Sequence, residues 1–65
     1  MAEEIEITEV DGPRGRAVIY EVTLPGGQVI EVEYRVDFGG RRESVQSLGE
    51  AHLLANQLTG LDDES

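Results

Sequence analysis

Apolar and polar residues alternate along three segments of this chain, and such alternation is typical of half-buried β-strands. The three segments are residues 3–10, 16–24 and 28–38. Glycine and proline are concentrated between them, at residues 11–15 and 25–27. Because glycine and proline favour turns, the pattern predicts three strands joined by two short hairpin connections.

The loop length and the apolar pattern favour the same register for the second hairpin. A three-residue loop, Pro25-Gly26-Gly27, would pair Leu24 with Gln28, whereas a two-residue loop would mix apolar and charged side chains on each face. The three-residue loop also places Tyr20 beside Val32. We therefore expect the even-numbered residues of both strands to share the buried face.

A short fourth strand is predicted over residues 41–46. Gly39-Gly40 has the composition of a two-residue hairpin turn. Such a turn would pair Asp37 with Arg42 and place Val45 on the buried face. If this segment is irregular, the sheet has three strands.

One amphipathic helix is predicted after the strands. Ser47 and Glu50 have the spacing of a capping box, and Gly60 suits the left-handed residue that ends a helix. The apolar stripe of this helix consists of Leu48, Ala51, Leu54, Ala55 and Leu58. The segment 62–65 that follows, three acidic residues and a serine, predicts a disordered acidic tail.

These elements predict a single small α+β domain over residues 1–61. Its sheet is an antiparallel three- to four-stranded meander (β-β-β-(β)-α) with the C-terminal helix packed on one face. The core is expected to combine the helix stripe with Ile5, Ile7, Val18, Tyr20, Val22, Ile30, Val32, Tyr34, Val36, Phe38 and Val45. With 65 residues and no cysteine, the domain must rely on this small core or on self-association.

The charge balance restricts the class of partner. Fourteen acidic and five basic residues give a net charge of −9. Such a chain repels phosphate, which disfavours binding to nucleic acid or to an anionic membrane and favours a basic protein partner. Apolar runs are too short to span a membrane and the first residues lack a signal-peptide pattern, so the expected location is the cytoplasm.

The sheet face without the helix is the candidate partner-binding surface. We expect it to carry Ile19, Glu21, Val29, Glu31, Glu33 and Arg35. In the predicted register Glu21 lies opposite Glu31, and like charges in opposite positions destabilise a sheet. A small domain that retains this pair would be suited to docking a basic protein, for example as an inhibitor that imitates nucleic acid.

Two other interpretations of the acidic face remain open. The glutamates could simply keep a solvated sheet from aggregating through its edges. Alternatively, Glu21, Glu31 and Glu33 could bind a divalent cation, although strand carboxylates without an Asp-rich loop are a weak signal for such a site.

Other functional classes have less support in the sequence. Leu53 would point outward from the helix, with His52 at the border of the apolar stripe, and together with His52 and Asn56 it could form a two-fold contact in a homodimer. Direct nucleic-acid binding through Arg35, Arg41 and Arg42 is opposed by the net charge. With one histidine, no cysteine and its glycine pairs in hairpin turns, the chain predicts no catalytic, metal or cofactor site. The expectation is a non-enzymatic binding or regulatory protein.

Overall fold

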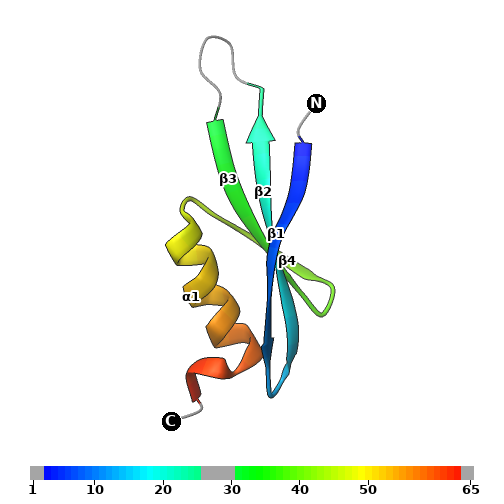
Figure 1. Ribbon diagram of the computed structural model, residues 1–65, viewed down its shortest axis with the longest axis vertical. Coiled ribbons are helices and arrows are strands. Elements are labelled where there is room, and N and C mark those ends of the chain that lie inside the picture. Colours follow the sequence, from blue (N-terminus) through cyan, green and yellow to red (C-terminus); the bar gives the residue numbers. More distant parts are fainter. Residues whose placement is uncertain (1–2, 26–30, 64–65) are drawn as a thin grey trace.

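A computed structural model describes residues 3–25 and 31–63 of the chain. Its elements are β1 (Glu3–Gly12), β2 (Gly15–Leu24), β3 (Glu31–Phe38), β4 (Arg41–Val45), α1 (Leu48–Thr59) and the 3₁₀ helix η1 (Leu61–Asp63). The strands form one antiparallel sheet in the order β1-β2-β3-β4, and α1 packs on one of its faces (Figure 1). The predicted α+β meander is confirmed, with the fourth strand present.

The hairpin between β3 and β4 forms as the sequence predicts. Gly39 and Gly40 have φ angles of 58° and 83°, which side chains other than glycine rarely adopt. The two-residue turn pairs Asp37 with Arg42, and it pairs Tyr34 with Val45 further along the strands.

The helix also begins and ends at the predicted residues. The Ser47 hydroxyl accepts a hydrogen bond of 3.1 Å from the backbone N–H of Glu50, and Gly60 has a φ of 80° at the C-cap. The predicted tail differs in part, because Asp62 and Asp63 belong to η1, while residues 64–65 lie outside the described residues. In the described part of the chain, no helix is long and apolar enough to cross a membrane.

The register between β2 and β3 differs from the prediction by three residues. Tyr20 lies opposite Arg35 instead of Val32, and Leu24 lies opposite Glu31 instead of Gln28. Because three is odd, the shift reverses the two faces of β2 relative to β3. The predicted register is therefore wrong. The connection itself, residues 26–30, lies outside the described residues.

The reversed faces of β2 change the composition of the core. Ala17 and Ile19 are fully buried beneath α1, while the expected core residues Val18, Tyr20 and Val22 lie on the opposite face of the sheet. The sequence allowed this error because β2 carries apolar residues at both odd and even positions. The expected core residue Ile30 lies outside the described residues.

A β-bulge in β1 changes which of its residues face the helix. The pairing with β2 shifts between Glu6 and Thr8, which leaves Ile7 as the extra residue. After the bulge Val10 faces the core, whereas Ile5 and Ile7 are 57% and 42% exposed. The prediction that Ile5 and Ile7 belong to the core is wrong.

The core lies between α1 and the half of the sheet next to the β1–β2 turn. Its buried members are Val10, Ala17, Ile19, Val36, Ala51 and Ala55. Half-buried residues packed against them are Tyr34, Phe38, Val45, Leu54 and Leu58. Two expected core residues, Leu48 and Val32, are instead exposed.

The helix is too short to cover the sheet from end to end. A strand of ten residues, such as β1 or β2, spans roughly 33 Å, whereas the twelve residues of α1 span roughly 18 Å. Accordingly the first part of β1, the last part of β2 and the first part of β3 extend beyond α1 (Figure 1). We call this part of the sheet, residues 3–6, 21–24 and 31–33, the overhang.

Candidate binding surface

The predicted partner-binding residues are divided between the two faces of the sheet. We call the face on which α1 packs the helix-side face, and the other the open face. Ile19 is buried on the helix-side face, and Glu21 lies further along β2 on that same face. The open face carries Glu31, Glu33 and Arg35. The expected continuous surface is therefore wrong, and Val29 lies outside the described residues.

The same division removes the expected carboxylate pair. Glu21 lies opposite Ile5 on one side and Tyr34 on the other, so it does not face Glu31. The cation site that would use Glu21, Glu31 and Glu33 is contradicted as well, because these carboxylates do not converge on one face. Within residues 3–25 and 31–63, no group of three or more acidic or histidine side chains could hold a metal ion.

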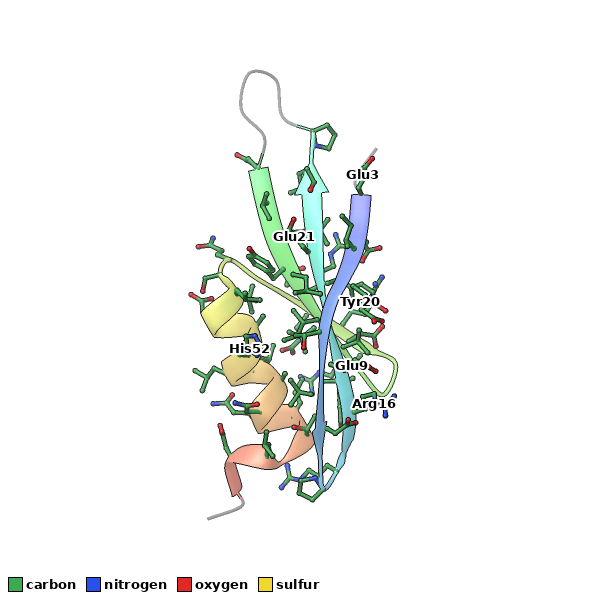
Figure 2. All side chains as sticks on the ribbon, in the orientation of Figure 1. Glu3, Glu9, Arg16, Tyr20, Glu21 and His52 are labelled. Atoms are coloured by element: carbon green, nitrogen blue, oxygen red, sulfur yellow. The ribbon has the colours of Figure 1, made fainter. Side chains whose placement is uncertain are left out.

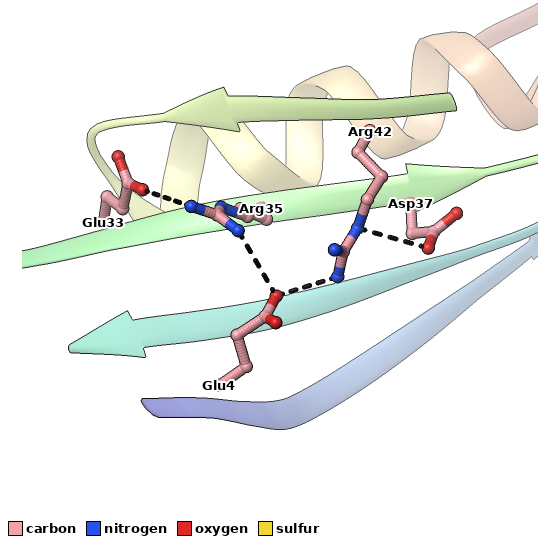
Figure 3. Close-up of polar contacts among 5 residues, drawn as sticks. All are labelled: Glu4, Glu33, Arg35, Asp37 and Arg42. Carbon is pink, nitrogen blue, oxygen red and sulfur yellow. Dashed lines mark hydrogen bonds and ion pairs between the residues drawn. The ribbon is translucent and has the colours of Figure 1, made fainter. Parts of the chain in front are cut away.

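A chain of ion pairs crosses the open face (Figure 3). Arg35 lies 3.2 Å from Glu33 and 3.7 Å from Glu4, and the same Glu4 oxygen lies 2.8 Å from Arg42. Arg42 also lies 3.5 Å from Asp37. Three carboxylates thus alternate with two guanidinium groups, so the side chains of this network neutralise most of one another's charge.

This ion-pair network also covers apolar side chains of β2. Val22 lies between Glu4 and Glu33 in the register, Arg35 joins those two glutamates, and Val22 is fully buried. The Arg42 guanidinium lies 5.6 Å from the centre of the Tyr20 ring, a distance suited to a cation–π contact. Long charged side chains can bury their stems along apolar surface in this way. The open face is therefore a second layer of packing.

Two further arginines are also paired within the chain. Arg16 lies 2.7 Å from Asp11 and 3.1 Å from Glu9. The hydrogen bond to Asp11, followed by the charges of Asp11 and Glu9, raises the pKa of Arg16 above its ordinary value. Arg41 lies 3.0 Å from Glu43.

The arginines considered for nucleic-acid binding do not gather into a basic patch. Arg35 and Arg42 lie on the open face, whereas Arg41 lies on the helix-side face opposite Phe38. Each of the three binds a carboxylate of its own chain. Their positive charge is therefore largely compensated before any ligand arrives.

The helix-side face of the overhang presents carboxylates without such compensation. Cross-strand pairing places Glu3 and Val32 on either side of Thr23, and the next row places Ile5 beside Glu21. Ile5 and Val32 are 57% and 43% exposed. In the described part of the chain, neither Glu3 nor Glu21 forms an ion pair. Figure 2 shows both glutamates on the part of the sheet beyond the helix.

We call Glu3, Ile5, Glu21 and Val32 the overhang patch. It combines exposed aliphatic side chains with negative charge, and it lies on a sheet face that no described helix covers. Only Glu21 of these four was expected at a binding surface from the sequence. The other three could have been identified by comparing the lengths of the predicted strands and helix, because a helix of this length is too short to cover strands of this length.

The residues considered for a dimer contact differ in exposure on α1. His52 is exposed, Leu53 is 54% exposed and Asn56 is half-buried. A single exposed leucine is common on protein surfaces and does not by itself identify an interface. The homodimer therefore stays a prediction.

Comparison with known proteins adds no further constraint on the site. No protein family, curated protein or solved structure matches this chain.

Proposed function

We propose that this chain is a non-enzymatic binding or regulatory protein that docks a basic segment of a partner protein on the overhang patch. The observation that carries the proposal is the coincidence of two exposed aliphatic residues with two unpaired carboxylates on an uncovered sheet face. Exposed apolar area of this kind, bordered by charge, is typical of interaction sites.

The charge distribution supports a basic partner for this surface. Four arginines form ion pairs with carboxylates of the open face, the first hairpin and β4. The charge of Glu3 and Glu21 is left uncompensated, within a chain of net charge −9. Such a field accelerates the approach of a cationic partner and opposes the approach of an anionic one.

The aliphatic residues would supply most of the affinity once the partner is in place. Ile5 and Val32 retain 57% and 43% of their exposure, so a docked apolar side chain could still bury substantial area on them. Burial is worth about 25 cal/mol per Å² of apolar surface. The proposed partner segment therefore carries both basic and apolar side chains.

Charge reversal on the patch tests the proposal. We expect the double variant Glu3→Lys, Glu21→Lys to lose the basic proteins that the unchanged chain captures from an extract of its source organism. The captured proteins are identified by mass spectrometry at two salt concentrations. Because the attraction is electrostatic, capture by the unchanged chain should also decrease at the higher salt concentration.

A control with the same change in net charge separates the patch from the overall charge. Glu50→Lys, Asp62→Lys alters two exposed carboxylates that lie on α1 and η1 and form no ion pair among the described residues. This control should capture the same proteins as the unchanged chain. Equal capture by the patch variant and the control would overturn the proposal, provided that circular dichroism shows both variants folded.

A further inference from the structure

β1 is an edge strand along its whole length. Its only neighbour in the sheet is β2, so among the described strands none pairs with the other side of β1. Backbone N–H and C=O groups alternate between the two sides of a strand, and those on the outer side of an edge are free to pair with another chain. The segment Glu3–Glu6 is the part of β1 that belongs to the overhang. It pairs regularly with β2, because the bulge begins only after Glu6.

The side chains along this edge favour one kind of added strand. Ile5 lies on the helix-side face and Glu6 on the open face, where Glu6 forms no ion pair among the described residues. Residues opposite each other in paired strands point to the same face of the sheet. An added strand in which basic and apolar residues alternate would therefore place apolar residues beside Ile5 and Glu3 on the helix-side face, and basic residues beside Glu6 and Glu4 on the open face.

The charge of β1 argues against a second copy of this chain as the added strand. β1 carries five carboxylates and no basic residue: Glu3, Glu4, Glu6, Glu9 and Asp11. Two β1 strands side by side would bring like charges into neighbouring positions, which destabilises a sheet. A basic strand would meet opposite charges at those same positions.

We propose that an extended segment of alternating basic and apolar residues pairs with the outer edge of β1 at Glu3–Glu6, with its apolar side chain against Ile5. This inference rests on the proposed function and deepens it, because it states the conformation in which the partner docks. Strand addition would enlarge the overhang patch by one strand and would give the partner backbone hydrogen bonds in addition to side-chain contacts.

A synthetic peptide tests the proposal without knowledge of the natural partner. The probe is an acetylated and amidated octapeptide of alternating arginine and valine. We expect saturating peptide to slow hydrogen exchange about tenfold or more at the outward-facing backbone amides of residues 3–6, because paired amides are protected. Docking through side chains alone would leave these amides exchanging at their original rate.

Matched variants locate the contact. Replacing Ile5 with serine should weaken peptide binding about fivefold to tenfold, because apolar burial on the strand is lost. Leu53→Ser, which alters an equally exposed leucine on α1, should bind the peptide unchanged. Glu6→Gln should weaken binding about twofold to fivefold, and Glu50→Gln should not.

The outcomes separate this inference from the proposed function. Peptide binding that depends on Ile5 but leaves the amides of β1 unprotected would overturn strand addition and leave docking on the overhang patch intact. The same inference fails if the peptide does not bind, or if it binds only where Leu53 is present. The proposed function would then be judged on the charge-reversal experiment alone.

Discussion

The covered half of the sheet and the overhang are built from the same strands, but their apolar residues differ in solvent exposure. In the covered half Ala17, Ile19 and Val36 are fully buried. On the same face of the overhang Ile5 and Val32 remain about half exposed. The difference arises because α1 does not extend over the overhang (Figure 1). Alternation along a strand thus identifies its faces, while the length of the covering helix decides which apolar residues are buried.

The two halves also differ in what holds them together. In the covered half the chain turns back tightly against the helix end, where the backbone N–H of Arg14 donates a hydrogen bond of 2.8 Å to the Thr59 carbonyl. In the overhang the cover comes from the open face, where the ion-pair network of Glu4, Arg35 and Glu33 lies over the buried Val22. Packing against a helix dominates one half, and charged side chains contribute to the other.

The largest expected effect comes from truncating a residue in the covered half. Ile19→Ala should lower the free energy of unfolding by about 3 kcal/mol, because a fully buried isoleucine is replaced by a cavity. Ile5→Ala should lower it by less than about 1 kcal/mol, since Ile5 is more than half exposed. Urea unfolding followed by circular dichroism measures both values.

A milder substitution keeps this comparison measurable in so small a domain. Ile19→Val should cost about 1 kcal/mol and leave the chain folded if Ile19→Ala does not fold. Equal costs for Ile5→Ala and Ile19→Ala would mean that both isoleucines share one environment. That result would contradict the observed register, and a larger cost for Ile5→Ala than for Ile19→Ala would support the predicted one, in which Ile5 lies in the core and Ile19 on the uncovered face.

Much of the fold could be predicted because its local signals do not compete with one another. Gly39 and Gly40 need positive φ angles, Ser47 caps the helix and Gly60 ends it, and each residue type has few other structural uses at such a position. Likewise β3 carries its apolar residues at even positions only, so its helix-side face was identified correctly.

The register of β2 could not be predicted from the same kind of argument. Both of its faces are apolar, because one packs beneath α1 and the other beneath arginine and glutamate side chains. In such a strand the alternation of apolar and polar residues does not show which face is buried. The predicted register of β2 with β3 therefore depended on the assumed loop length. No glycine or other turn-forming residue marks the bulge at Ile7 in the sequence. The prediction therefore also assigned the wrong residues of β1 to the helix-side face. Because the candidate site depended on both registers, most of its residues were assigned to the wrong face.

A medium effect is expected where the first hairpin meets the end of the helix. A Cβ atom at Gly12 would lie 2.5 Å from the carbonyl oxygen of Thr59, so the backbone would have to move apart. Gly12→Ala should therefore lower the free energy of unfolding by about 2 kcal/mol, within the usual cost of overpacking. Thermal and urea unfolding of the variant provide the measurement.

Gly49→Ala is the control for this glycine substitution. Apart from its chain neighbours and the backbone of its own helix, no atom lies within 4 Å of a Cβ placed at Gly49, which is in the first turn of α1. Alanine has the higher helix propensity, so the control should raise the free energy of unfolding by about 0.5 kcal/mol. If Gly12→Ala proved as harmless as Gly49→Ala, the close approach of the hairpin to Thr59 would be refuted.

The smallest effect is expected in the ion-pair network of the open face. Glu4→Gln keeps the shape of the side chain but removes the charge that Arg35 and Arg42 share. We expect a loss of about 0.5–1 kcal/mol in the free energy of unfolding at low salt, because exposed ion pairs are worth little individually and somewhat more when networked. The loss should shrink in 1 M sodium chloride as the charges are screened.

Glu6→Gln is the matched control, because Glu6 lies on the same strand and the same face but forms no ion pair among the described residues. Removing its charge should leave the stability unchanged or raise it slightly, since the chain carries a net charge of −9. The difference between the two variants isolates the contribution of the ion pairs from that of the overall charge. If both variants had the same stability at low and at high salt, the ion-pair network would not stabilise the overhang. Burial of Val22 would then have to stabilise this part of the sheet without the ion pairs.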